Sequence, residues 1–351
     1  MSVNSILYSN GVASMLGQKL FAVDKFNRLA ESGNLASAVK ILYETGYGGG
    51  ITIGNPTDYI KILDAEMNIA VDFYKYHCVD SNAKVCFLTG YDYLNCKLLY
   101  KAIRMNRQVS NQCNKYGLLT AEQIDDCIRK NDCDCLPGPM HTAIDILNTQ
   151  YVDVVKPATI DIVFDRAMYE DIVGVASRCT SPQIEQYYRL KVDFINILSA
   201  FRCAKARLCA DKYRELIIDC GNLSAGQLMS CYSDNTDAIM DNYRQLLVIA
   251  DPSGIDTELR YYRQKDYLDL CRMCVQALTE NKSFCSAEVL AFNRCKDVLQ
   301  PHKSELNTIL PFITYFLSKT TEIDNVKMVL TCIANNVDSA LIKLRLKELY
   351  V

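Results

Sequence analysis

Two groups of cysteines carry the residue types and spacing that could support metal or redox chemistry. They are Cys127, Cys133 and Cys135 with nearby His141, and separately Cys271 with Cys274. Zinc prefers thiolate and imidazole ligands, but tetrahedral sites usually join two close pairs of ligands, and here a suitable second pair is missing. Redox catalysis by the second group would require a βαβ setting, which the surrounding sequence does not show. We therefore expect reduced thiols and no metal.

A glycine-rich stretch, GYGGGITIG at residues 46–54, invites comparison with phosphate-binding loops. Such loops lie between a strand and a helix, with lysine and Ser/Thr at fixed offsets or three glycines at dinucleotide spacing. This stretch has neither arrangement, so we expect a flexible connection. The chain also has only three histidines and no Gly-x-Ser-x-Gly motif, which disfavours hydrolase chemistry. The sequence predicts no catalytic residue and no cofactor.

The composition disfavours nucleic acid and a membrane span. The chain has 351 residues, a net charge of -3 and 50% apolar residues, without the ~20 consecutive apolar residues that a membrane span requires. A chain-wide positive charge that would attract nucleic acid is missing. The N-terminal residues do not resemble a secretory signal, and the 17 cysteines are an odd number that cannot pair completely. We therefore expect a cytoplasmic protein.

The spacing of apolar residues along the chain is mainly that of helices. In residues 185–209, apolar side chains recur at spacings of three and four, as on the packed face of a helix. This apolar seam consists of Tyr187, Leu190, Phe194, Ile197, Phe201, Ala204 and Leu208. Thr120 and Gln123 match a capping box that opens another helix. Strand-like alternation is limited to short stretches at 51–53 and 154–162, so the predicted fold class is all-α.

One helical motif occurs three times in the chain. Residues 91–105, 192–206 and 321–335 align on an asparagine, at offsets of 101 and 129 residues. In each copy an acid lies three residues before the asparagine. The pairs are Asp92 with Asn95, Asp193 with Asn196, and Glu322 with Asn325. Offsets of this size indicate related domains rather than a solenoid.

The acid and the asparagine of each pair share one face of a helix, because residues three apart are neighbours on a helix surface. Such a pair could hold the helix in register against a neighbour or fix a local bend. Alternatively, these are solvated polar residues that flank an apolar stripe. The sequence leaves both interpretations open.

Basic residues gather at two places. They are Arg189, Lys191, Arg202, Lys205 and Arg207 in the middle of the chain, and Lys343, Arg345 and Lys347 near its end. A solvated helix face is the simplest interpretation. The functional interpretation takes Lys205, Arg207, Lys343 and Arg345 as contacts to a protein partner, because charges at the rim of an interface set orientation and association rate.

The chain resembles the C subunit of the prokaryotic V-type (A-type) ATPases, whose eukaryotic relative is the d subunit of the V-ATPase. Three segments carry the resemblance: FLTGYDYLNCKLLYKAI at 87–103, FDRAMYEDIVGVASRCTSPQIEQYYRLKVDFINILSAFRCAK at 164–205, and PFITYFLSKTTEIDNVKMVLTCIANNVDSALIKLRLKELYV at 311–351. The segments PGPMHTAIDI and LAESGNLASAVKILYETGYG also fit. The resemblance therefore covers nearly the whole chain.

The resemblance implies a non-catalytic rotor adaptor that couples the central stalk to the membrane proteolipid ring, during ATP-driven ion transport or ATP synthesis. It implies a funnel of three pseudo-symmetric helical domains, at residues 1–115, 116–230 and 231–351, with parts of the chain end packing on the first. Its partners would be the stalk subunits and the ring, on the cytoplasmic face of the membrane, without a small-molecule substrate. The main alternative is a helical scaffold or tether unrelated to rotary ATPases, and a metal or thiol enzyme is a distant third.

Overall fold

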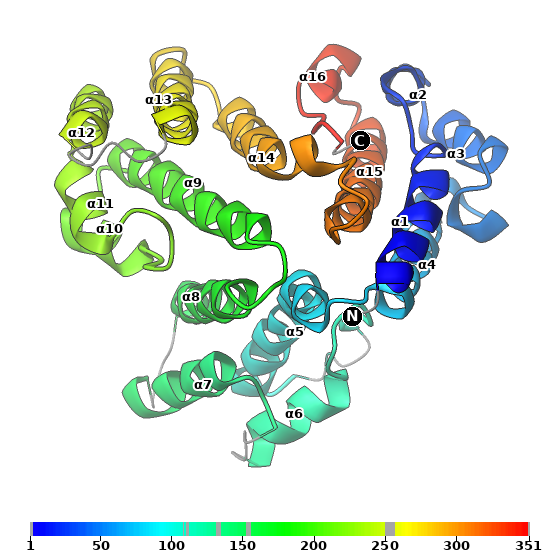
Figure 1. The fold of residues 1–351 in the computed structure, drawn as a ribbon, viewed down its shortest axis with the longest axis horizontal. Helices are drawn as coiled ribbons and strands as arrows, with labels where there is room; N and C mark the ends of the chain where they lie inside the picture. The colour runs from blue at the N-terminus through cyan, green and yellow to red at the C-terminus, as the bar shows by residue number, and fades with distance from the viewer. Residues whose placement is uncertain are drawn as a thin grey trace. The chain divides into compact units, whose positions relative to one another are not determined.

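The computed structural model describes residues 3–107, 109, 112–130, 135–151, 156–249 and 257–349. The regular elements in these ranges are all helices, which confirms the predicted all-α class (Figure 1). The two candidate strands are not strands in the described residues. Residues 51–53 lie outside any helix, and residues 157–162 open a long one.

The chain divides into two compact units. Unit 1 joins Met1–Lys84 to Lys296–Val351, and unit 2 is Val85–Cys295. The boundaries fall inside two helices, α5 (Ser81–Arg104) and α14 (Cys285–Leu299). The division into three repeat domains and their arrangement as a funnel stay predictions.

Unit 1 is built around a long helix from the C-terminal part of the chain. Its helices are α1 (Val3–Gly17), α2 (Val23–Ala30), α3 (Leu35–Glu44), η1 (Tyr47–Gly50), η2 (Pro56–Asp58), α4 (Ile60–His77), η4 (Gln300–His302), α15 (Leu310–Ala334) and α16 (Ser339–Lys343). The long helix α15 packs against α1, α2, α3 and α4 (Figure 1). Tyr74 of α4 stacks on Phe316 of α15, with ring centroids 3.9 Å apart.

A buried asparagine on α1 fixes this helix to the segment that leads into α15. The side-chain amide of Asn10 donates hydrogen bonds of 2.9 Å to the carbonyl oxygens of both Leu306 and Thr308. Its side-chain oxygen accepts the N–H of Phe312 at 3.1 Å. Segments from the two ends of the sequence are therefore joined by polar contacts as well as by apolar packing.

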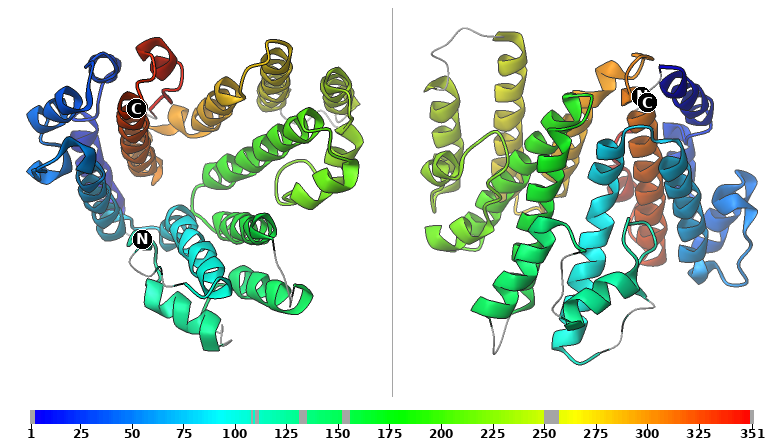
Figure 2. Two further views of the ribbon diagram at one scale, coloured as in Figure 1. Left: turned by 180° about the vertical axis from the view of Figure 1, so that it is seen from behind. Right: turned by 60° about the horizontal axis from the view of Figure 1, so that its bottom comes forward.

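Unit 2 contains the other long helices. Besides most of α5 and α14 it holds α6 (Ala121–Lys130), α7 (Gly138–Gln150), α8 (Pro157–Ala176), α9 (Gln183–Lys205), α10 (Ala210–Leu216), α11 (Ala225–Cys231), α12 (Thr236–Ile249) and α13 (Thr257–Thr279). Helix α9 packs against α8 on one side and α13 on another, and Figure 2 shows the three side by side. Helices α5 to α8 share a hydrophobic core that includes Tyr93, Tyr100, Ile124, Met140 and Phe164.

The predicted apolar seam of α9 is buried except at its last member. Residues from Tyr187 to Ala204 on this seam are at most 5% exposed. Leu208 is 40% exposed, because α9 ends at Lys205 and Arg207 turns the backbone into the left-handed region at φ 53°. The prediction that the seam reaches Leu208 was therefore wrong by one turn.

The glycine-rich stretch is an ordered turn rather than only a connection. Its residues Tyr47–Gly50 form η1, which packs against α4. Gly48 is buried at φ +71°, and a β-carbon there would lie 2.9 Å from the side chain and the carbonyl oxygen of Ile62. Glycine is required at this position both for the backbone conformation and for the close approach.

Capping boxes open two of the short helices in unit 2. The predicted box before α6 is confirmed, because the Thr120 N–H donates to Oε1 of Gln123 (2.8 Å) and the Gln123 N–H donates to Oγ1 of Thr120 (3.2 Å). Ser224 and Gln227 form the same box before α11. Both boxes come directly after loops whose backbone binds acidic side chains of α5 and α9.

Candidate functional site

The asparagine of the second repeat binds one residue of a distant loop. Asn196 is fully buried on α9. Its side-chain amide donates to the carbonyl oxygen of Ile218 at 2.9 Å, and its side-chain oxygen accepts the N–H of the same residue at 3.0 Å. A carboxamide has both a donor and an acceptor, so it satisfies both backbone polar groups of a buried residue, as a neighbouring strand would.

The other two asparagines make the same pair of hydrogen bonds. Asn95 on α5 pairs with both backbone groups of Asn114, each at 3.0 Å. Asn325 on α15 pairs with those of Lys347, at 2.8 and 3.1 Å. The partner follows the asparagine by 19, 22 and 22 residues in the three repeats. In each repeat the asparagine therefore fixes a loop that follows its own helix.

The acid of each pair binds backbone N–H groups. Asp193 accepts the N–H groups of Asn222 (3.0 Å) and Leu223 (3.1 Å), and Asp92 accepts those of Leu118 (3.0 Å) and Leu119 (2.9 Å). In both repeats these donors lie four and five residues after the residue that the asparagine holds. We call each acid and asparagine, together with the backbone groups that they bind, a clamp, and number the clamps in chain order.

In the third clamp the donor to the acid comes from the other end of the chain. Glu322 accepts the N–H of Phe21 at 2.6 Å, a residue 301 positions away in the sequence. Phe21 lies two residues before α2, as Leu119 lies two before α6 and Leu223 two before α11. The N-terminal segment therefore occupies, in the third clamp, the place that the continuing loop occupies in the first two.

The three clamp helices also end in the same way. The residue eleven positions after the clamp asparagine has a left-handed backbone in each repeat, at Asn106 (φ 52°), Arg207 (φ 53°) and Asn336 (φ 55°). The next N–H then donates to the carbonyl five residues earlier, in the pairs Arg107–Ala102, Leu208–Cys203 and Val337–Cys332. This is the hydrogen bond of a Schellman motif, which satisfies carbonyl groups left open at a helix end.

Glycines allow the loops of the first two clamps to approach their aspartates. A β-carbon at Gly117 would lie 2.7 Å from Cγ of Asp92, and one at Gly221 would lie 3.0 Å from Cγ of Asp193. Neither glycine has a positive φ, so the requirement is close approach rather than an unusual backbone conformation. In the third clamp the residue two before Phe21 is Lys19, and the acid is the longer glutamate. A glutamate side chain is one methylene group longer than that of aspartate, so it is able to reach a backbone that lies farther away.

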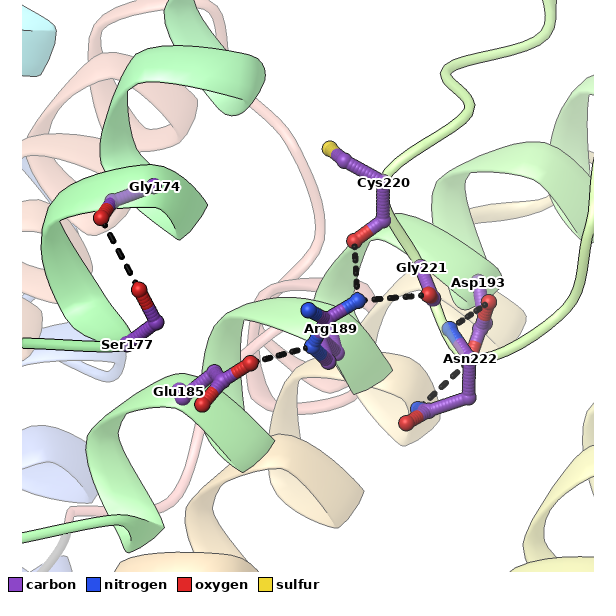
Figure 3. A network of polar contacts seen from close by, with 8 residues as sticks. All are labelled: Gly174, Ser177, Glu185, Arg189, Asp193, Cys220, Gly221 and Asn222. Atoms are coloured by element: carbon purple, nitrogen blue, oxygen red, sulfur yellow. Dashed lines mark hydrogen bonds and ion pairs between the residues drawn. The ribbon is translucent and has the colours of Figure 1, made fainter.

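The second clamp has additional side-chain contacts (Figure 3). Arg189, one turn before Asp193 on α9, donates to the carbonyl oxygens of Cys220 (3.3 Å) and Gly221 (3.0 Å), and pairs with Glu185 at 2.7 Å. Asp193 also accepts the hydroxyl of Tyr267 on α13 at 2.5 Å. Burial raises the pKa of Asp193, while the hydrogen bonds from Tyr267 and Asn222 oppose that shift.

The third clamp contains a buried group of charges instead. Nζ of Lys319 lies 2.5 Å from Oε1 of Glu66 and 2.6 Å from Oε1 of Glu322. Glu66 also accepts the N–H of Gly48 at 2.6 Å, so this group fixes the glycine-rich turn. Burial raises the pKa of Glu322, and the neighbouring Lys319 ammonium opposes the shift. One lysine thus compensates two buried carboxylates.

The four basic candidates for partner contact divide into two kinds. Lys205 donates to the carbonyl oxygen of Lys282 at 3.2 Å, and Lys343 forms an ion pair with Glu31. Arg207 and Arg345 are exposed and form no ion pair with the residues that the structure describes. Of the four, only Lys343 pairs with an acid among the described residues, and the two arginines form neither an ion pair nor a side-chain hydrogen bond there.

The cysteines do not assemble a metal centre within the described residues. No group there has three or more metal-binding side chains close together. Cys127 contacts Cys135, His141 pairs with Asp145 at 3.2 Å, and Cys133 lies outside the described residues. Cys271 and Cys274 are fully buried on α13, where burial raises the pKa of both thiols.

Several residues of the clamps were missed by sequence reasoning. They are Gly117, Gly221, Tyr267, Glu66 and Lys319; Arg189 was noted only as a basic residue and was not connected to the clamp. The two glycines could have been found, since each lies three residues before the first residue of a capping box. An alignment on the asparagines does not match them, because the loops before them differ in length. The others occur in only one repeat, so comparing the repeats could not have found them.

The chain matches the model of a known protein family. The family model described as ATP synthase (C/AC39) subunit matches residues 9–345, which is nearly the whole chain. A search of the curated proteins gives no match. Among the described helices, none combines the length and apolar character needed to cross a bilayer.

Proposed function

Because the chain belongs to the ATP synthase (C/AC39) subunit family, we propose that it is the non-catalytic adaptor of a rotary ATPase that joins the central stalk to the membrane proteolipid ring. In this role it transmits torque between ATP turnover and ion movement, at the cytoplasmic face of the membrane. The observation that carries the proposal is the family match over residues 9–345. The clamps add a physical reason why this chain suits the role.

An adaptor under torque must resist deformation, and the clamps supply resistance at the loops, where helical proteins are usually softest. Each clamp holds a loop through hydrogen bonds from buried acid and asparagine side chains to the loop backbone. Moving such a loop would leave buried polar groups without partners, at about 1–3 kcal/mol per group. The clamp residues are therefore proposed to keep the protein stiff rather than to bind a ligand.

Copurification tests the proposed position in the complex. The tagged chain should retain a central-stalk component and the proteolipid ring after detergent extraction. A complex assembled without the chain should hydrolyse ATP but show little ATP-driven ion transport. Recovery of neither partner, or full transport without the chain, would reject the adaptor role.

Charge reversal tests the two exposed arginines as contacts. The double variant Arg207→Glu/Arg345→Glu should weaken assembly, most strongly at low salt, because rim charges act over about one Debye length. The control is the double variant Arg129→Glu/Lys130→Glu on α6, which changes the net charge by the same amount. Both of these residues already pair with aspartates. Equal assembly of the two variants would remove the arginines as contacts, while leaving the copurification test of the adaptor role intact.

A further inference from the structure

The thiols of Cys127 and Cys135 lie closer together than unbonded sulfur atoms normally do. Their Sγ atoms are 2.8 Å apart, whereas those of Cys86 and Cys179, another contacting pair in unit 2, are 3.9 Å apart. A disulfide requires about 2.05 Å. Two thiolates on one tetrahedral zinc, each about 2.3 Å from the metal, would lie about 3.8 Å apart. The spacing therefore favours a sulfur–sulfur bond over a shared metal.

The two thiols differ in access to solvent. Cys135 is exposed, whereas Cys127 is 6% exposed in the last turn of α6. Cys127 belongs to the hydrophobic core that α5 to α8 share. An oxidant in solution therefore reaches Cys135 first, and Cys127 is already in place behind it.

We propose that Cys127 and Cys135 form a reversible disulfide when the protein meets a hydroperoxide. For hydrogen peroxide, the Cys135 thiolate attacks one oxygen, and the O–O bond breaks to give a sulfenic acid at Cys135 and hydroxide. The Cys127 thiolate then attacks the Cys135 sulfur, and hydroxide leaves as the S–S bond forms. In sum, two thiols and one hydrogen peroxide give one disulfide and two waters. A reducing dithiol reverses the reaction by exchange.

The bond would connect the end of α6 to the chain just before α7. The start of α6 follows Leu119, whose N–H is held by Asp92 in the first clamp. A covalent link at the other end of α6 would thus fix this helix at both ends. The proposal does not depend on the proposed function, since it concerns this chain alone.

The test uses the purified full chain, reduced and then treated with one equivalent of hydrogen peroxide. Intact mass should fall by about 2 Da, and peptide mapping should find Cys127 linked to Cys135. The midpoint of thermal unfolding should rise by about 5 °C and return after treatment with a dithiol. Cys135→Ser should lose both effects. Cys179→Ser, which alters the more distant pair, should keep both.

The proposal is overturned if the peroxide-treated chain contains no link between these residues, or if Cys135→Ser shows the same fall in mass as the wild type. A predominant link to Cys133 or between Cys86 and Cys179 would also overturn it. Because Cys135 is exposed, its serine variant should fold, and its circular dichroism before oxidation verifies this.

Discussion

Gly221 packs so closely against Asp193 that a β-carbon would lie 3.0 Å from Cγ of the carboxylate, and closer still to Oδ1. Asp193 is fully buried and is held by several hydrogen bonds, so it cannot move aside without losing them. We expect Gly221→Ala to lower the free energy of unfolding by about 2–3 kcal/mol. Urea denaturation of the purified chain measures this change.

Gly174 offers a matched control for that substitution. It lies in α8, and a β-carbon there would meet nothing within 4 Å. Gly174→Ala should therefore be neutral or stabilise the protein by up to about 1 kcal/mol, because alanine is the better helix former. Equal effects of the two glycine substitutions would contradict the close approach at the second clamp.

Removing the asparagine of the second clamp should leave both backbone groups of Ile218 without partners. We expect Asn196→Ala to cost about 2–4 kcal/mol, and Asn196→Asp to be at least as harmful, because a carboxylate oxygen would face the Ile218 carbonyl. Ser199→Ala on the same helix is the control, since the Ser199 side chain forms no hydrogen bond with the described residues. Calorimetric unfolding compares the three variants. If Asn196→Ala left the unfolding temperature unchanged, the result would favour the alternative that Asn196 is a solvated polar residue.

The aromatic residue two positions before that asparagine should be essential for stability. Phe194 is 1% exposed and makes an edge-on contact with Tyr267, at 5.8 Å between ring centroids. Phe194→Asp should cost more than about 4 kcal/mol, because it removes a core side chain and buries a charge. Leu208→Asp should cost less than about 1 kcal/mol, since Leu208 is largely outside the core and 40% exposed. Similar melting temperatures of both variants would refute the burial of the seam.

The third clamp should make stability depend on pH. Burial raises the pKa of Glu322 in the folded protein. The protonated side chain therefore stabilises the folded state fully at pH values below the ordinary glutamate pKa of about 4.3. That contribution is lost as the pH rises through the raised pKa. Glu322→Gln lacks this titration, so the stability of the wild type relative to this variant should fall with rising pH. Urea denaturation at a series of pH values from about 4 to 8 measures it, and parallel profiles would disprove it.

The sequence was sufficient to predict the all-α class and to find the acid and the asparagine of each clamp. Both came from periodicity: the seam of α9 recurs every three or four residues, and the repeats align without gaps from residues 91–105 to 192–206 and 321–335. The capping box at Thr120 was also predictable, because its signature is local.

The partners of the clamps could not be predicted in the same way. The loop residues that Asn95 and Asn196 bind lie at different separations, because α10 stands in the second loop. Phe21 meets Glu322 only through the tertiary fold. The end of α9 was misjudged because Arg207 adopts a left-handed backbone that usually selects glycine or asparagine.

The closure of the third clamp by Phe21 has a consequence for biosynthesis. Residues 85–295 form one continuous unit, and because compact units generally fold as wholes, we expect it to fold while the ribosome is still adding the remainder. Helices α1 to α4 leave the ribosome earlier, yet the α15 surface that covers them is translated almost last. Their apolar faces must wait for it, so this early segment is where a chaperone would be needed most.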